Sequence, residues 1–296
     1  MKKILITGGK GFFSKRLTEF YKDQYEFIVT DKEELDIVDN EKVEEFFTQY
    51  RPDYVIHAAA IAVTDFCNKR PDIAQKINVD GAVNVARAAK RVSAKLVFLS
   101  SEQVFNGNEN AGPFSEEDVA VPNTVYGANK LEAEALLKDI IDELWIVRFT
   151  WMFGLPERNN NMVNNILWDT LTSILKNEKI YASPHEFRGM TYVYDMIENF
   201  EKVFSLPFGT YHLGSINNMS RYEMVKHIFS SLGIEERINE LVVEDTEKYS
   251  DNPRDIRLVT DKAKSYGIEF PDSGEAMRRC VEEYKIRLKQ ESGLLV

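Results

Sequence analysis

The sequence predicts an α/β protein built on a doubly wound parallel sheet, with a smaller α/β lobe in its C-terminal half. A short apolar run at 4–7 leads directly into a glycine-rich turn, which is typical of a buried strand followed by a helix. Strand-like and helix-like segments then alternate up to residue 150, and the alternation loosens from Trp151 onward. We therefore expect one domain over 1–150 and a second lobe over 151–296, with a soft boundary and with parts of that lobe returning to the sheet.

The glycine turn is the first candidate for a binding site. The apolar run ends at Gly8 and Gly11, and apolar residues at helical spacing begin at Phe12 and Phe13. Glycine lets a ligand approach the main chain, and a helix N-terminus offers free N–H groups and a partial positive charge to a pyrophosphate. The spacing departs from the common Gly-x-Gly-x-x-Gly pattern, so a tight turn without a ligand remains an alternative.

The remaining elements of the first half follow from hydrophobic periodicity. Short runs rich in β-branched residues indicate strands, and apolar residues every three to four positions indicate helices. Asp39 or Asn40 is placed to cap the first of the later helices. We expect strands at 26–30, 54–57, 95–100 and 144–150, and helices at 40–50, 73–92 and 124–141.

The second half has shorter and less regular elements. A polar loop, PERNNN, occupies 156–161, and no internal repeat or low-complexity segment is present. We expect helices at 164–175, 195–204, 221–232 and 273–290, and short strands at 191–193 and 210–213.

Composition excludes several classes of protein. The 296 residues carry 37 Lys and Arg against 48 Asp and Glu, a net charge of −11, which argues against nucleic acid as a partner. Two cysteines, Cys67 and Cys280, fit a reducing compartment, and no apolar run is long enough to span a membrane. The N-terminal apolar run is too short for a signal peptide, so we expect a cytoplasmic protein without a membrane partner.

The four histidines do not predict a metal site. They are His57, His185, His212 and His227, and none of them has the spacing of metal ligands to another histidine or to a cysteine. His57 ends the strand at 54–57, and we expect it to pack in the interior.

An acid at the end of the second strand bears on the identity of a dinucleotide. Asp31 lies 20 residues after Gly11, where an acid hydrogen-bonds the 2′-hydroxyl of an adenosine ribose. Lys32 follows directly and could pair with a 2′-phosphate instead. The choice between NAD and NADP therefore stays open, and the carboxylate favours NAD.

A tyrosine and a lysine on the helix at 124–141 are the candidates for acid–base chemistry. Tyr126 and Lys130 are four residues apart and share a helix face, where an ammonium would lower the pKa of the phenol. Tyr222 and Lys226 have the same spacing, so the spacing alone does not discriminate. The helix of the first pair follows a strand that ends in Ser100-Ser101, where a hydroxyl could hold a substrate carbonyl beside the tyrosine.

Several motifs occur in the order found in one protein family. The motifs of the first half are GGKGFFS (8–14), LDIVD (35–39), RPDYVIHAAA (51–60), NVDG (78–81), LSSEQVFNG (99–107), YGANK (126–130) and VRFTWMFG (147–154). Further motifs continue almost to the end of the chain, through TYVYDM, GTYHLG and NPRDIRLVT. Together they resemble the extended short-chain dehydrogenases/reductases and, within that group, the dTDP-4-dehydrorhamnose reductases.

The resemblance implies a Rossmann-type domain, a nicotinamide cofactor (NAD or NADP) and a nucleotide-sugar substrate. It implies hydride transfer to a sugar C4 ketone, with Tyr126 as proton donor, Ser101 beside the carbonyl and Lys130 also holding the nicotinamide ribose. It further implies cofactor contacts at Gly8, Gly11, Phe12, Phe13, Asp31, Asp36, Ile37, Ala58, Ala59, Ala60, Asn78, Ser100, Tyr126 and Lys130, and substrate contacts at Glu102, Val104, Trp151 and Arg254.

Three departures from the family pattern affect what the resemblance implies. Ser101-Glu102-Gln103 stands where the reductases usually have Thr-Asp-Tyr, and the amide of Gln103 cannot act as the base of a dehydratase. Met190 replaces a proline, and the neighbouring Phe187-Arg188 is unusual, so the sugar pocket can differ.

Alternatives to a reductase share the same sequence features. An epimerase would use the same Tyr–Lys chemistry and return the hydride to the sugar. A non-catalytic binding subunit, like the regulatory subunit of methionine adenosyltransferase, also resembles these reductases, although the intact Ser–Tyr–Lys set favours an enzyme. By family resemblance we expect a homodimer.

Overall fold

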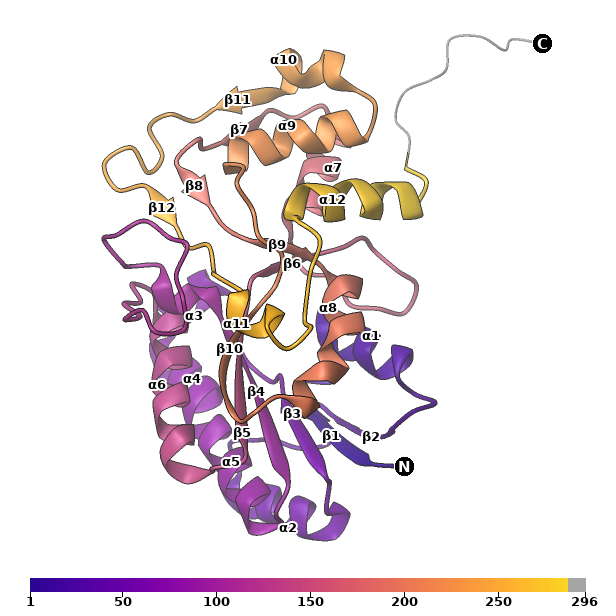
Figure 1. The fold of residues 1–296 in the computed structure, drawn as a ribbon, viewed down its shortest axis with the longest axis vertical. Coiled ribbons are helices and arrows are strands. Elements are labelled where there is room, and N and C mark those ends of the chain that lie inside the picture. The colour runs from indigo at the N-terminus through magenta and orange to yellow at the C-terminus, as the bar shows by residue number, and fades with distance from the viewer. Residues whose placement is uncertain (287–296) are drawn as a thin grey trace, which may run out of the picture.

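The structure, a computed structural model, describes residues 1–286. Its centre is a six-stranded sheet in which every pair of neighbours is parallel (Figure 1). The strands, in the order in which they lie side by side, are β10 (Gly209–Leu213), β5 (Leu144–Phe149), β4 (Lys95–Ser101), β3 (Tyr54–His57), β1 (Lys3–Thr7) and β2 (Glu26–Thr30).

Helices cover both faces of this sheet, which confirms the doubly wound α/β class. Figure 1 shows α1 and α8 on one side of the strands and α2, α5 and α6 on the other. No helix in residues 1–286 combines the length and the apolar character needed to cross a membrane. The helical segments that accompany the sheet are α1 (Phe12–Phe20), α2 (Asn40–Tyr50), α3 (Thr64–Lys69), α4 (Pro71–Gln75), η1 (Lys76–Asp80), α5 (Gly81–Arg91), η2 (Glu102–Phe105), α6 (Val125–Ile140) and α8 (Val193–Phe200).

The alternation of side chains along β1 explains the two helical layers. Ile4 and Ile6 point into a hydrophobic cluster with α1 and α8, whereas Leu5 points into a second cluster with α2, α5 and α6. Successive side chains of a strand face opposite sides of the sheet, so an uninterrupted apolar run fits a strand that is buried on both faces. The core therefore lies in two layers, one on each side of the strands.

Capping residues set two helix starts that matter for the site. The Asp39 carboxylate accepts a hydrogen bond from the Lys42 N–H at 3.2 Å, so Asp39, one of the two expected caps, begins α2. The Thr124 hydroxyl accepts one from the Gly127 N–H at 3.2 Å and begins α6. The first turn of α6, which packs against η2 after β4, is thereby fixed.

The expected continuous helix at 73–92 is wrong in one respect. A π-helical turn, η1, interrupts it between α4 and α5. Within that turn, the Asn78 side chain accepts a hydrogen bond from the Ile61 N–H at 2.7 Å and donates one to the Ile61 carbonyl at 3.0 Å. The wider turn therefore ties the helix to the segment after β3, a contact that periodicity cannot reveal.

The C-terminal part of the chain forms most of a second lobe, seen at the top of Figure 1. Three two-stranded parallel pairs, β6·β9, β7·β11 and β8·β12, accompany its helices. The expected helix at 273–290 is present as α12 but ends at Glu283, and the part of that expectation beyond residue 286 lies outside the described residues. The elements are β6 (Trp151–Phe153), α7 (Ile166–Lys176), β7 (Ile180–Ala182), β8 (Glu186–Phe187), β9 (Met190–Tyr192), η3 (Glu201–Ser205), α9 (Arg221–Ser231), η4 (Glu235–Arg237), α10 (Ile238–Leu241), β11 (Val242–Glu244), β12 (Arg254–Asp255), α11 (Asp261–Lys264) and α12 (Ser273–Glu283).

One strand of the C-terminal part belongs to the central sheet. β10 pairs in parallel with β5, with Thr210 opposite Ile146 and His212 opposite Arg148. The sheet is thus completed by a segment that follows β5 by about sixty positions in the chain. This pairing brings side chains from both parts of the sequence to the ends of β4 and β5.

Candidate active site

A cleft of about 480 Å³ lies at the carboxyl ends of β1, β2 and β3, where parallel sheets bind nucleotides. Its walls come from the glycine turn, from the segment after β2 and from the segment after β3. Eight of the residues expected to contact a cofactor line it: Gly8, Gly11, Asp31, Asp36, Ile37, Ala58, Ala59 and Ala60.

The glycine turn has the geometry of a pyrophosphate cradle. Gly8 has a φ of +67°, and a Cβ placed on it would meet the Ala59 main chain at 2.8 Å. Gly11 occupies the N-cap of α1 and provides no side chain to cap the helix, so the first N–H groups of α1 are free for an anion. Phe12 and Phe13 are buried and point into the core, so only their main-chain N–H groups can serve a ligand.

Asp31 is held at the edge of the cleft by main-chain donors. Its two carboxylate oxygens accept hydrogen bonds from the Lys10 N–H at 3.2 Å and from the Lys32 N–H at 2.8 Å. The Lys10 ammonium is paired with Glu33 at 2.8 Å, and the Lys32 side chain is exposed. The carboxylate is therefore held in the cleft wall between the main chain of the glycine turn and that of the segment after β2.

The cleft also contains residues that the sequence reasoning missed. Ile73, Lys76 and Ile77, from α4 and η1, also line it. Asn78, which we expected to contact a cofactor, is absent from the lining and holds Ile61 instead. No signal in the sequence marks the π-helical turn that brings these residues to the cleft.

Tyr126 and Lys130 lie one turn apart on the side of α6 that faces β4. Lys130 is 2% exposed, and its ammonium donates a hydrogen bond to the Leu99 carbonyl at 2.8 Å. The same ammonium lies 4.6 Å from the centre of the Phe98 ring and 5.9 Å from the centre of the Tyr126 ring. The helix therefore brings both side chains to the end of β4.

The electrostatics of this pair differ from our expectation. Burial raises the pKa of Tyr126 to about 12, and a hydrogen bond with the Ser101 side chain opposes that shift. The prediction that Lys130 lowers this pKa is wrong for this geometry, because burial of the phenolate dominates and the ammonium is directed at a main-chain carbonyl. At neutral pH Tyr126 is therefore a neutral phenol, the state required of a proton donor.

The two serines at the end of β4 have different partners. The Ser100 hydroxyl is buried and donates a hydrogen bond to the Glu134 carboxylate at 2.5 Å. Ser101 is half-buried, and its hydroxyl accepts a hydrogen bond from the Gln103 N–H at 3.2 Å as the cap of η2. Ser101 is therefore the hydroxyl that lies beside Tyr126, whereas Ser100 faces the interior.

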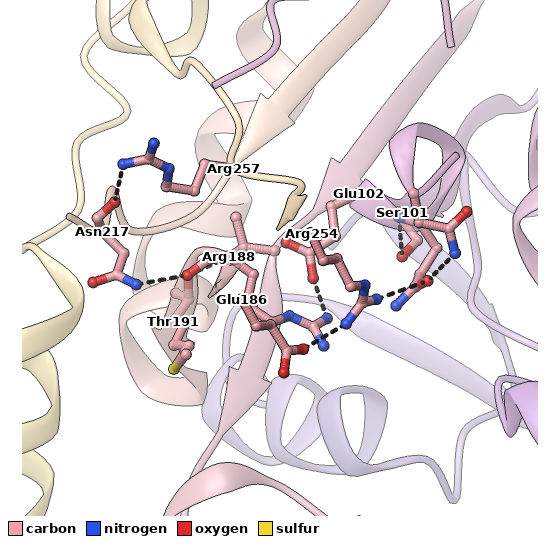
Figure 2. A network of polar contacts seen from close by, with 12 residues as sticks. Ser101, Glu102, Glu186, Arg188, Thr191, Asn217, Arg254 and Arg257 are labelled. Carbon is pink, nitrogen blue, oxygen red and sulfur yellow. Dashed lines mark hydrogen bonds and ion pairs between the residues drawn. The ribbon is translucent and has the colours of Figure 1, made fainter. Parts of the chain in front are cut away.

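An ion pair directly after Ser101 joins the two parts of the chain (Figure 2). Glu102 is fully buried and pairs with Arg188, whose guanidinium lies 4.4 Å from the centre of the Trp151 ring. Burial raises the pKa of Glu102, while the positive charge of Arg188 opposes that shift. Glu102 and Trp151, both expected at a substrate site, are thus connected through an arginine that we had noted only as unusual.

A second carboxylate holds the remaining predicted substrate residue. Arg254 pairs with Glu186 at 2.6 Å across the β8·β12 ladder and reaches the Gln103 amide oxygen at 3.4 Å. Arg221 approaches the same carboxylate at 3.6 Å. Although burial acts to raise it, the pKa of Glu186 is lowered by these two arginines. Figure 2 shows the contacts that connect this cluster to the end of β4.

Val104 is the predicted substrate residue that lies outside this cluster. It is fully buried and packs with Phe105, Phe114 and Leu258 in a separate small core. Glu186 and Arg221, in turn, were missed, because their relation to Arg254 depends on strand pairing between distant segments.

Nicotinamide-dependent short-chain dehydrogenases/reductases combine a doubly wound parallel sheet with a Tyr-x-x-x-Lys pair at the end of its fourth strand. This chain has both, in that arrangement, and falls in the extended branch of the class. It belongs to the RmlD substrate binding domain family, whose profile matches residues 1–286. The resemblance inferred from the motifs is thereby confirmed.

Relatives and solved structures match almost the full length. Spore coat polysaccharide biosynthesis protein SpsK of Bacillus subtilis is 30% identical over 284 residues, which cover 96% of this chain and 98% of that protein. dTDP-4-dehydrorhamnose reductase of Aggregatibacter actinomycetemcomitans is 28% identical, with coverage of 94% and 98%. The structure of dTDP-4-dehydrorhamnose reductase from Bacillus anthracis in complex with NADP has a TM-score of 0.84 at 28% identity and covers 96% of this chain and 99% of its own.

Proposed function

We propose that this protein reduces the C4 ketone of a nucleotide-linked sugar, with a nicotinamide dinucleotide as the source of hydride. The observation that carries the proposal is the placement of Tyr126 and Lys130 at the end of β4, with Ser101 beside the phenol. The similarity to dTDP-4-dehydrorhamnose reductases over both halves of the chain supports the substrate class.

The side chains of the site have distinct tasks in this proposal. A nicotinamide dinucleotide bound in the cleft would supply the hydride for the carbonyl carbon. Tyr126 is a neutral phenol at neutral pH and donates its proton to the oxygen that becomes an alkoxide. The Ser101 hydroxyl donates a hydrogen bond to the same oxygen, and the Lys130 ammonium holds the nicotinamide ribose close to the phenol.

The cluster after β4 is proposed as the sugar-nucleotide site. Glu102, Arg188 and Arg254 lie directly beyond Ser101, and Trp151 packs against the Arg188 guanidinium. Most of these side chains come from residues after 150, so we assign the substrate lobe to 151–296. Within that range, β10 is the strand that pairs with the central sheet. Arginines and a partly exposed aromatic ring suit a ligand that carries phosphate and sugar groups.

A spectroscopic assay tests the reductase against the alternatives. We expect the purified protein to oxidise NADH stoichiometrically when a dTDP-linked 4-keto sugar is added. Conversion of the sugar without net loss of NADH would indicate an epimerase. Tight NADH binding without turnover across a panel of keto sugars would contradict an enzymatic function and support a binding subunit.

We further propose that NADH is preferred over NADPH. Asp31 lines the cleft beside the acidic residues Glu33 and Glu34, and a 2′-phosphate would meet these charges. Dissociation constants for both dinucleotides measure the preference, and Asp31→Ala should narrow it. Tighter wild-type binding of NADPH would show that Lys32 decides the choice instead.

A further inference from the structure

A buried polar network lies directly beneath the catalytic lysine, and the proposed reaction assigns it no task. Tyr126, Lys130 and Glu134 follow one another at intervals of four along α6 and share the face that packs on β4. Glu134 is 1% exposed and sits one turn below Lys130. A carboxylate at this depth requires partners, because burying an unpaired charge is costly.

Two neighbouring strands provide the partners of Glu134. Arg148 of β5 binds it in a bidentate manner, with Nη2 at 2.6 Å from Oε2 and Nε at 2.9 Å from Oε1. Ser100 of β4 donates its hydroxyl to Oε1 at 2.5 Å. Ser100 directly follows Leu99, whose carbonyl accepts the hydrogen bond of Lys130. Glu134 therefore fixes α6 to β4 at Ser100, the residue next to the one that accepts the lysine hydrogen bond.

Arg148 is held on its other side by a histidine from the returning strand β10. Its Nη1 lies 3.4 Å from Nε2 of His212, and Nδ1 of His212 lies 3.2 Å from the Val259 carbonyl. Burial, together with the charge of Arg148, lowers the pKa of His212 to about 3, so the ring is neutral and Nε2 can accept. The guanidinium is thus held from both sides, by Glu134 and by His212.

The charges that face Lys130 come from three elements. His57 of β3 is buried, packs against Phe98 and has a pKa lowered to about 3 by burial, so it is neutral. On α6 itself, Tyr126 is a neutral phenol and Glu134 is a carboxylate. Arg148 of β5 forms an ion pair with that carboxylate. Among residues 1–286, Glu134 is the group whose charge opposes the effect of burial on Lys130.

We propose that Glu134 is a positioning residue for the reaction, which anchors α6 to β4 and β5 and places its carboxylate one turn from the active-site ammonium of Lys130 on the same face of the helix. The proposal deepens the proposed function, on which its catalytic meaning rests. It concerns a residue that touches neither substrate nor cofactor and acts through Lys130.

The readout is the pH dependence of NADH binding, which a merely structural role would leave unchanged. Burial lowers the pKa of Lys130 to about 8, so wild-type affinity for NADH should fall as pH rises through that value. The midpoint of this titration is the pH at which half of the fall in NADH affinity has occurred. Glu134→Gln should move the midpoint to lower pH by about one unit, the size expected for loss of an adjacent opposite charge. Glu134→Asp retains the charge and should return the midpoint to the wild-type value.

Glu132→Gln is the matched control. It makes the same change of charge on the same helix, but Glu132 is exposed and contacts only the Gln75 amide, at 2.8 Å, in the described residues. Its midpoint should equal that of the wild type. If Glu134→Gln fails to fold because Arg148 is left unpaired, the double variant Glu134→Gln/Arg148→Gln removes both buried charges and should show a smaller shift in the same direction.

The proposal would be overturned if the pH midpoint of NADH binding in Glu134→Gln, or in the double variant, equalled the midpoint in Glu132→Gln. The test is separable from the proposed function, because it measures NADH binding without a sugar substrate. A wild-type protein that binds NADH but reduces no keto sugar would refute the reductase and leave the role of Glu134 toward Lys130 to be decided by the same titration.

Discussion

Two helices of this protein carry a tyrosine and a lysine four residues apart, in opposite settings. On α6 the lysine is buried against β4 and is bound to a main-chain carbonyl at 2.8 Å. On α9 the buried face is formed by Met224, Val225, Ile228 and Phe229, and Tyr222 and Lys226 lie partly exposed beside it. Spacing therefore creates a pair on either helix, and the surface against which the helix packs decides its chemistry.

Proximity within the pair does not distinguish the two helices. The lysine ammonium lies 5.0 Å from the tyrosine ring centre on α9 and 5.9 Å on α6. The difference lies in the surroundings, because α6 places its pair beside a serine hydroxyl at the end of a parallel strand. A cation close to a phenol is thus insufficient for a catalytic site without a strand end and a cofactor cleft nearby.

The strongest test of this comparison is removal of each phenol. Tyr126→Phe keeps the ring and the helix but removes the proton donor, so kcat should fall by about a hundredfold to ten-thousandfold. Tyr222→Phe should leave kcat near the wild-type value. Steady-state oxidation of NADH with the cognate keto sugar measures both. Near wild-type turnover by Tyr126→Phe would exclude the proposed mechanism.

Removal of each lysine ammonium should have a smaller effect than removal of the phenol, and the quantity affected is the affinity for the cofactor. Hydrogen bonds to charged groups contribute about 1.5–3 kcal/mol, so Lys130→Met should weaken NADH binding by about tenfold to a hundredfold. Lys226→Met should leave the affinity unchanged. Fluorescence titration with NADH provides the comparison, and equal affinities for the two variants would contradict the assignment of Lys130 to the nicotinamide ribose.

The pH dependence of stability tests the burial of the α6 pair. The pKa of Lys130 is lowered from 10.5 to about 8 in the fold, so the unfolded chain binds more protons between these values and stability rises with pH there. Relative to Lys130→Met, the free energy of unfolding of the wild type should increase by about 2 kcal/mol from pH 8 to pH 10. Urea denaturation at several pH values measures this, and a constant difference would argue against burial of the ammonium.

The smallest effect is expected for the α9 pair itself. The exposed cation–π contact between Lys226 and Tyr222 contributes about 0.5–1 kcal/mol, which is the loss of stability expected for Lys226→Met. Thermal unfolding at neutral pH can detect this loss. A loss of several kcal/mol would show that α9 depends on the pair for packing and that the contrast with α6 is overstated.

Local patterns in the sequence determined the strands at 26–30 and 54–57, the glycine turn and the helix that carries Tyr126 and Lys130. These features are short-range, because side-chain periodicity and glycine conformation depend on a few neighbouring residues. Family motifs then identified the class of protein and, together with the glycine turn and Asp31, half of the residues that line the cleft. The lowered pKa of Tyr126, which its spacing to Lys130 predicted, was wrong, since burial is a property of the whole fold.

Contacts between distant segments were decided only by the tertiary structure. The pairing of β10 with β5 brings His212 to Arg148, and the pairing of β8 with β12 brings Glu186 to Arg254. Each contact joins residues more than sixty positions apart, and no local pattern encodes which of many carboxylates an arginine will meet. Charge pairing of this kind depends on where packed elements place side chains in three dimensions, and for that reason the scaffold beneath Lys130 and the Glu102–Arg188 pair could be seen only in the folded chain.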